Sequence, residues 1–112
     1  MNMSLIMSLD RVFEALASAP RRRIIAYLSE GELSTSQLAE RFEMTAPAIS
    51  RHLSILESAG LVSGERRGQF VMYHLHRDRL VDDVTGYLFE VCPSSELVKS
   101  ESRRLARRRK AA

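Results

Sequence analysis

The chain has 112 residues, of which 45% are hydrophobic and 28% are charged, and its formal net charge is +3. This length fits a single domain with a modest hydrophobic core. No apolar run is long enough to span a membrane, Leu5, Ile6 and Met7 are too few for a signal-peptide core, and one cysteine excludes an intrachain disulfide framework. We therefore expect a cytoplasmic globular protein that makes no contact with a membrane.

The first part of the chain predicts three helices after a flexible start at residues 1–7. Ser8 can cap the first helix, and Pro20 suits the first turn of the second because proline lacks the backbone N–H that this position leaves unpaired. Gly31 is expected to end the second helix. Ser34 and Gln37 have the spacing of a capping box, which marks the start of the third helix.

Three consecutive arginines, Arg21, Arg22 and Arg23, lie at the start of the predicted second helix. Backbone N–H groups at a helix N-terminus attract anions, so this cluster is a candidate for contact with phosphate. The alternative is a solvated helix face without a binding role, and the sequence leaves both interpretations open.

Residues 45–58 are the most informative segment, because apolar and small polar side chains separate to opposite faces of a helix. Ile49, Leu53 and Leu56 recur at helical spacing and mark the core side. Small residues on the other face allow a close approach to a grooved partner, and Arg51 adds a forked donor suited to a guanine edge or a phosphate. With the short helix before it, this segment predicts a DNA-binding helix-turn-helix whose recognition helix is residues 45–58.

A β-hairpin is predicted directly after the recognition helix. Residues 61–67 and 70–75 are strand-like, and residues 68–69 form the turn between them. Arg66 and Arg67 lie at the tip, where we expect contact with the minor groove or with phosphates, the alternative being a solvated hairpin. A hairpin in this place is typical of the winged variant of the motif.

Residues 77–91 predict a fifth helix with a broad apolar face. So small a domain has too little core of its own to cover such a face. We therefore expect this face to stay uncovered within the domain itself.

The C-terminal segment, residues 93–112, carries seven Lys or Arg residues against two Glu residues. Its charge density and serine content favour a disordered basic tail that adds sequence-independent affinity for DNA. A short helix around Leu97, Val98 and Leu105 is the alternative. The folded domain is expected to span residues 8–92.

Several segments together carry a family resemblance: Ala15–Ile25, Leu38-Ala39, Ala48–Leu53, Leu56, Ala59–Val62, and Arg67-Gly68 through Tyr73–Leu75. On these residues the chain resembles the ArsR/SmtB family of winged-helix repressors, nearest to its autorepressor-like (SdpR-like) branch. The resemblance implies a mainly α (α+β) fold, a winged helix-turn-helix with about five helices plus a two-stranded β-hairpin wing. It also implies a homodimer that binds double-stranded operator DNA.

The expected DNA contacts lie on the small-residue face of the recognition helix and at the wing. They are Thr45, Ala46, Pro47, Ser50, Arg51, His52, Ser54, Arg66, Arg67 and Gln69. For His52, which lies on the flank of the core stripe, packing against the domain is an equally good interpretation.

The dimer interface follows from the resemblance, because in the family the first and last helices pair across a two-fold axis. The implied interface residues are Leu9, Val12, Phe13, Leu80, Val84, Tyr87, Leu88 and Val91.

Metal sensing occurs in many relatives, but the residues here do not favour it. Ser34 and Ser36 occupy the places where relatives carry a cysteine pair, and serine hydroxyls are poor ligands for soft or borderline metals. A second family site uses Asp and His from the paired terminal helices, and residues 77–91 offer Asp78, Asp82, Asp83 and Glu90 but no histidine. His74 and His76 lie on the second predicted strand or at its end, where a surface role is favoured over metal binding. We expect no metal and no other cofactor.

Cys92 is the one cysteine and stands beside Pro93. A cross-subunit disulfide or capture of a small thiol would make it a redox site if the last helices meet at the dimer axis. A buried or idle thiol is the alternative that we favour.

These observations predict a dimeric transcriptional repressor that acts by occupying its operator and does not respond to metal. Two alternatives remain: a redox-responsive repressor acting through Cys92, and a protein-interaction module on the same fold. No catalytic motif or phosphate-binding glycine loop is visible, so we do not expect an enzyme. The sequence specifies no small-molecule effector.

Overall fold

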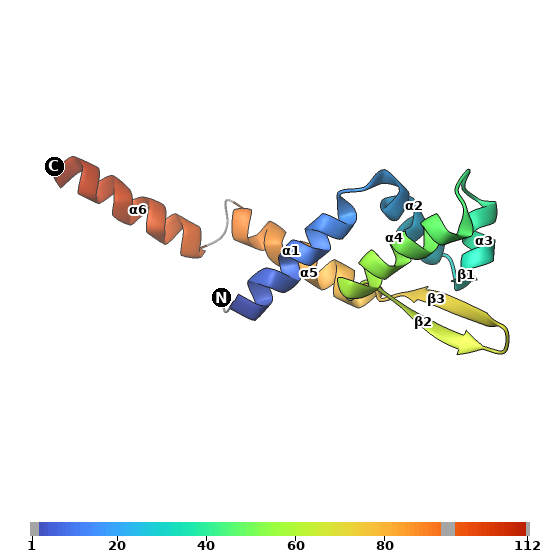
Figure 1. Cartoon of the computed structure of the whole chain (residues 1–112). Helices are drawn as coiled ribbons and strands as arrows, with labels where there is room; N and C mark the ends of the chain where they lie inside the picture. Colours follow the sequence, from blue (N-terminus) through green and yellow to red (C-terminus); the bar gives the residue numbers. More distant parts are fainter. Residues whose placement is uncertain (1–2, 93–95, 112) are drawn as a thin grey trace. The chain divides into compact units, whose positions relative to one another are not determined.

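The computed structural model describes residues 3–92 and 96–111, and within them six helices and three strands (Figure 1). The chain divides into two compact units, Met1–Leu80 and Val81–Ala112. The helices are α1 (Met3–Leu16), α2 (Ala19–Leu28), α3 (Thr35–Glu40), α4 (Ala46–Ser58), α5 (Arg77–Val91) and α6 (Glu96–Ala111). The strands are β1 (Leu33–Ser34), β2 (Val62–Arg67) and β3 (Phe70–Leu75). The predicted mainly α winged helix-turn-helix fold is confirmed.

The helix starts of the helix-turn-helix are capped by side chains. Ser34 and Gln37 form the predicted capping box: Gln37 N donates to Ser34 Oγ at 3.2 Å, and Ser34 N donates to Gln37 Oε1 at 2.9 Å. At the start of α4, Thr45 Oγ1 accepts a hydrogen bond from Ala48 N at 3.3 Å. These bonds satisfy N–H groups that have no partner within the helix, which fixes where α3 and α4 begin.

Helix α2 begins as expected but ends earlier. Ser18 is its N-cap and accepts from Arg21 N at 3.4 Å, and Pro20 lies in the first turn. The helix ends at Leu28 with Ser29 as its C-cap, so Gly31 is not its end residue.

The core of the first unit lies where α1, α2, α3 and α4 meet the base of the sheet. Ile49, Leu53 and Leu56 are fully buried, as the spacing in the recognition helix predicted. The other fully buried side chains among the described residues are Val12, Ala15, Ile24, Leu38, Leu61 and Val62. The core side of α4 therefore leaves its opposite face exposed.

The sheet has three antiparallel strands in the order β1-β3-β2, so the prediction of a two-stranded wing was incomplete. Strands β2 and β3 pair from Val62 with Leu75 to Arg67 with Phe70, and β1 adds Leu33 beside Tyr73. The extra strand is only two residues long, which is too short to give an alternating sequence pattern.

Two glycines take a left-handed backbone conformation at the ends of β2. Gly60 has φ +78° just after α4, as expected for a residue that ends a helix, and Gly68 has φ +62° in the turn of the hairpin. A side chain at either position would strain the backbone.

The second unit contains most of α5 and all of α6. Glu96–Ala111 is helical in the structure, whereas the sequence favoured a disordered tail with a short helix as the alternative. Arginine, leucine, alanine and lysine dominate the end of this segment and favour helix, and the basic residues of its last turn complement the helix dipole. The side chains of Leu97 and Val98 lie outside the described residues.

The chain start also differs from expectation, because α1 already begins at Met3 although residues 1–7 were predicted to be flexible. Leucine, isoleucine and methionine in this stretch are compatible with helix. Among the residues that the structure describes, no helix combines the length and the apolar character needed to cross a membrane.

Candidate nucleic-acid interface

Helix α4 presents an exposed face made mainly of small and polar residues, with Ile55 (41% exposed) as a large apolar member. The predicted contact residues on it are all exposed: Thr45, Ala46, Pro47, Ser50, Arg51 and Ser54. Pro47, Arg51 and Ser54 lie opposite the buried stripe of Ile49, Leu53 and Leu56, whereas Thr45 and Ala46 are exposed at the N-terminal end of the helix. A grooved partner can therefore approach the backbone of this face closely.

Arg51 is exposed in the middle of this face and makes no hydrogen bond or ion pair to any residue in the described part of the chain. Its guanidinium therefore keeps all of its donors for a partner. A bidentate contact with a guanine or a phosphate uses such a fork.

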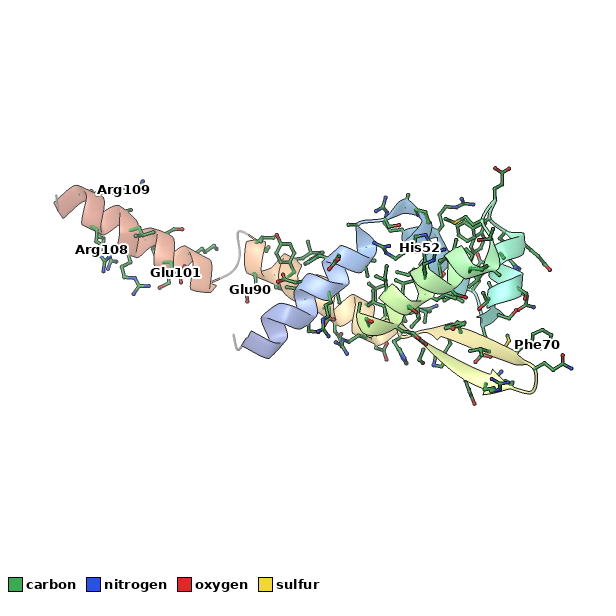
Figure 2. The ribbon with its side chains drawn as sticks, viewed as in Figure 1. His52, Phe70, Glu90, Glu101, Arg108 and Arg109 are labelled. Carbon is green, nitrogen blue, oxygen red and sulfur yellow. The ribbon has the colours of Figure 1, made fainter. Side chains whose placement is uncertain are left out.

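His52 lies between the exposed face and the core, and it is half-buried (Figure 2). Arg21 Nη1 donates to His52 Nδ1 at 3.4 Å. Burial lowers the pKa of His52, and the positive charges of Arg21 and Arg51 lower it further. His52 is therefore neutral near pH 7 and is partly occupied in packing against α2.

The arginine cluster of α2 is engaged within the protein. Arg21 Nε donates to Ala15 O at 2.7 Å and Arg21 Nη2 donates to Glu14 O at 3.1 Å. Arg22 Nη1 donates to Leu16 O at 2.7 Å. Because α1 has no basic residue in its last turn, these guanidinium groups supply the cations that its carbonyl end attracts.

Arg23, the third member of the cluster, lies over the ring of Phe42 with its guanidinium carbon 4.6 Å from the ring centroid. This is the geometry of a cation–π contact. The structure thus gives each arginine of the cluster an intramolecular role, and phosphate binding is not needed to explain any of them.

The wing places its two arginines on opposite faces of the sheet. Side chains alternate along a strand, so Arg66 shares a face with the buried Val62, whereas Arg67 shares the other face with Glu65. The two residues are adjacent in the sequence but cannot meet a partner in the same way.

Arg67 is held by two carboxylates. Its Nη1 and Nη2 donate to Glu32 at 2.6 and 3.0 Å, and Nη2 also donates to Glu65 Oε2 at 3.2 Å. These hydrogen bonds raise the pKa of Arg67, with Glu32 contributing most. Arg66 and Gln69 are exposed like Arg67, so the predicted wing contacts differ in whether carboxylates of the chain already hold the side chain.

Two further residues join the recognition helix to the wing, and neither was predicted from the sequence. Glu57 Oε1 on α4 accepts a hydrogen bond from Gly64 N on β2 at 3.0 Å. A Cβ at Gly64 would lie 2.8 Å from Val71 Cγ1 and 2.9 Å from Tyr73 Cε1, so only glycine fits without a shift. The pair sets the position of the wing relative to α4.

Phe70 is an exposed aromatic residue of the wing that was not predicted as a contact from the sequence. It stands at the wing tip beside the turn and is 55% exposed (Figure 2). Its place in the second predicted strand gave no signal of exposure, because only the turn geometry puts it beyond the core.

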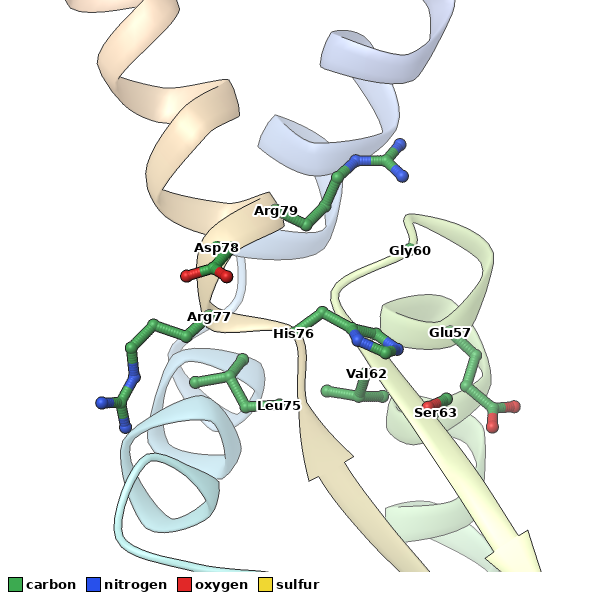
Figure 3. A pocket seen from close by; sticks show the side chains of 9 residues that line it. All are labelled: Glu57, Gly60, Val62, Ser63, Leu75, His76, Arg77, Asp78 and Arg79. Carbon is green, nitrogen blue, oxygen red and sulfur yellow. The ribbon is translucent and has the colours of Figure 1, made fainter.

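An open hollow of about 760 Å³ lies at the base of the wing (Figure 3). His76 points into it, and the guanidinium of Arg79 lies above Gly60, where a Cβ would come within 3.0 Å of Nη1. Arg79 Nη2 also donates to Ser8 Oγ at 2.8 Å, which ties the first turn of α5 to α1.

The candidate metal ligands either have other partners or lie too far apart to share a metal ion. Ser34 is 5% exposed, and its hydroxyl caps α3. His74 Nε2 lies 2.9 Å from Ser63 Oγ. In residues 3–92 and 96–111 no three His, Cys, Asp or Glu side chains are grouped to hold a metal ion. Cys92 is half-buried at the end of α5.

One residue assigned to the dimer interface belongs elsewhere. Val12 is 0% exposed because its side chain packs in the core of its own chain. It therefore has no surface left for a second copy, and assigning it to the interface was wrong. The remaining candidates keep exposed surface. In the first unit Phe13 is 36% exposed and Leu9 and Leu80 are half-buried; in the second unit Tyr87, Leu88 and Val91 are 42, 54 and 57% exposed and Val84 is half-buried.

Comparisons with known proteins agree on one family. Residues 19–63 match the model of a bacterial regulatory protein family, the arsR family. The transcriptional repressor SdpR of Bacillus subtilis (strain 168) is 36% identical over 80 residues, which cover 71% of this chain and 89% of that protein.

Solved structures show the same similarity. An ArsR-like transcriptional regulator from Rhodococcus sp. RHA1 superposes with a TM-score of 0.72 at 27% identity, covering 98% of this chain and 97% of that one. The homodimeric winged helix-turn-helix DNA-binding domain of a possible ArsR-family regulator from Mycobacterium bovis gives a TM-score of 0.67 at 28% identity, covering 76% and 80%.

Proposed function

Because the chain belongs to the ArsR family of bacterial regulatory proteins, we propose that it is a dimeric transcriptional repressor that acts by occupying operator DNA. Each copy contributes one recognition helix to one half of a palindromic site. The bound dimer then blocks access of RNA polymerase to the promoter.

The exposed face of α4 is the observation that carries this proposal. It joins a capped N-terminus at Thr45, small residues that permit close approach, and Arg51 with its donors available. A face used for binding another protein would instead favour bulky apolar residues. DNA is therefore the partner that this surface fits best.

The wing supplies a second contact. Arg66 near its tip is exposed, and the Glu57–Gly64 hydrogen bond joins the strand that carries it to α4. Two recognition helices related by a two-fold axis place the half-sites about one helical turn, or a near multiple, apart.

Metal is not the signal in this proposal. The position of Ser34, where relatives carry a cysteine, holds a nearly buried hydroxyl that is already committed to capping α3. A hydroxyl is also a poor ligand for soft or borderline metals. We accordingly expect DNA binding that zinc does not change.

The test is a gel-shift titration of the purified chain on the DNA upstream of its own gene, with a shuffled DNA of equal composition as the control. We expect a saturable complex on the upstream DNA that forms at lower protein concentration than on the control. The same affinity for both DNAs, or none for either, would contradict the proposal and favour a protein-interaction module.

Two additions to the titration separate the regulatory alternatives. Release of DNA by Zn(II) would contradict the metal-independent mechanism. Release by an oxidant that is abolished in Cys92→Ser would replace simple occupancy by a redox-responsive mechanism.

A further inference from the structure

Helix α6 is the most densely charged element of the described chain. Glu96–Ala111 carries seven Lys or Arg residues against two Glu residues, and every side chain from Lys99 to Lys110 is exposed. Figure 2 shows Arg108 and Arg109 projecting on different sides of this helix. The charge is thus present all around α6, but it is not evenly arranged.

Four of the cations form a continuous stripe. At 100° per residue, Lys99, Arg103, Arg107 and Lys110 fall within an arc of about 80° and span about 16 Å along the axis. The other cations, Arg104, Arg108 and Arg109, spread over the rest of the circumference. We call the first set the cationic stripe.

The cationic stripe destabilises α6 when no partner is bound. Like charges four residues apart, as in Lys99–Arg103 and Arg103–Arg107, repel each other and destabilise a helix. An isolated helix of this length is only marginally stable in water. An anionic partner that neutralises the stripe would remove the repulsion and stabilise α6.

The remaining surface of α6 does not favour a lipid partner. Leu105 is the one large apolar side chain of α6 within the described residues. A helix that lies in a membrane interface needs a broad apolar face to insert between the lipids, whereas the exposed Arg108 and Arg109 flank Leu105 on this helix. Phosphates along a nucleic-acid strand match a linear row of cations better.

We propose that the cationic stripe of α6 binds the phosphate backbone of DNA beside the operator as an oriented surface. This inference rests on the proposed function, and it adds a partner for a segment outside the helix-turn-helix. The contact adds affinity for any DNA sequence, because phosphates carry no base information.

The experiment compares two full-length variants that lose equal charge. The stripe variant carries Arg103→Gln, Arg107→Gln and Lys110→Gln, and the matched off-stripe variant carries Arg104→Gln, Arg108→Gln and Arg109→Gln. Glutamine keeps helix propensity close to that of arginine and lysine, and circular dichroism checks the helix content of both. Affinity for operator DNA and for shuffled DNA is measured over a range of salt concentrations.

The slope of log affinity against log salt falls by about 0.9 for each phosphate contact that is lost. We expect the stripe variant to lose about 2 to 3 units of slope on both DNAs, and the off-stripe variant to lose less than about 1. The ratio of operator to shuffled affinity should stay the same in all three proteins. We also expect helix content to rise when the unmodified chain binds DNA.

Equal losses in the two variants would overturn the oriented surface and leave only general charge attraction, with the proposed function intact. Failure of the unmodified chain to bind any DNA would overturn both proposals. Unchanged DNA affinity in both variants, together with stripe-dependent binding to vesicles of anionic lipid, would replace DNA by a membrane surface.

Discussion

Arg67 donates two hydrogen bonds to the carboxylate of Glu32, at 2.6 and 3.0 Å, although the two residues are 35 positions apart. The fork of the guanidinium is thereby used on a carboxylate of the same chain, and Glu65 engages it further. To reach a DNA phosphate, Arg67 must exchange one or both partners. The ion pair between Arg67 and Glu32 thus limits how much of the positive charge of the wing is available to DNA.

We predict that Glu32→Gln raises the affinity for DNA of any sequence. It frees the fork of Arg67 and removes a carboxylate that repels phosphates, so the salt dependence should steepen by up to about 0.9 units of slope. The melting temperature should barely change, because exposed ion pairs contribute little to stability.

Glu30→Gln is the matched control, since it removes the same charge from an exposed residue of the same loop. It should change DNA affinity by much less than Glu32→Gln. If Glu32→Gln instead weakens binding, the ion pair positions the wing, and Arg67 does not itself contact DNA.

Most of the helices could be predicted because several local signals coincide at their ends. Thr45 and Ser34 cap α4 and α3, and the apolar stripe of α4 has the period that its burial requires. Strand β1 could not be predicted, because its two residues exist as a strand only through pairing with β3. A helix in the segment of α6 was only the alternative prediction, because the charge density suggested disorder while the helix propensity of the residues favoured a helix.

The candidate site was predictable on the helix and less so on the wing. Arg51 is exposed because the helical period places it opposite the buried Leu53, and this period can be read from the sequence alone. Arg66 and Arg67 gave identical signals in the sequence. Only the strand register and the distant Glu32 separate their roles, and neither follows from local pattern.

We predict that Arg21→Met lowers stability and leaves the salt dependence of DNA binding unchanged. The substitution leaves the carbonyl groups of Glu14 and Ala15 without a charged donor. The free energy of unfolding should fall by about 1–3 kcal/mol, measured by urea denaturation. Arg22→Met, which loses one exposed hydrogen bond and the same charge, should cost less. A shallower salt slope in Arg21→Met alone would restore phosphate contact as its role.

The lowered pKa of His52 predicts a dependence of stability on pH. In the unfolded chain the group titrates near 6.5, whereas in the fold burial, Arg21 and Arg51 keep it neutral to lower pH. The unfolded state therefore binds more protons in this range, so stability falls as the pH drops below about 6.5. In His52→Gln this component should disappear from denaturation curves measured between about pH 7.5 and 5. Parallel stability profiles of the two proteins would contradict the assignment.

Leu88→Glu tests the dimer face of α5. Leu88 is 54% exposed in the single chain, and a carboxylate buried there by a second copy would be costly. We expect dissociation into monomers, measured by sedimentation. Gly86→Glu adds the same charge on the opposite side of the helix, where a Cβ meets nothing within 4 Å, and should leave the dimer intact. A stable Leu88→Glu dimer would place the interface elsewhere.

Arg51→Ala should weaken operator binding without affecting the fold. Arg51 is exposed and has no hydrogen-bonding partner among the described residues, so the melting temperature should stay the same. A lost bidentate contact with a base costs about 1–3 kcal/mol, which corresponds to an affinity about 5- to 150-fold lower.

Arg51→Lys is the informative companion, because it keeps the charge and removes the fork. If Arg51 contacts a base, Arg51→Lys should lose discrimination between the operator and a shuffled sequence while keeping most of its affinity at low salt. If Arg51 contacts only phosphate, Arg51→Lys should behave like the unmodified chain on both DNAs. Full operator affinity in Arg51→Ala would remove this residue from the interface.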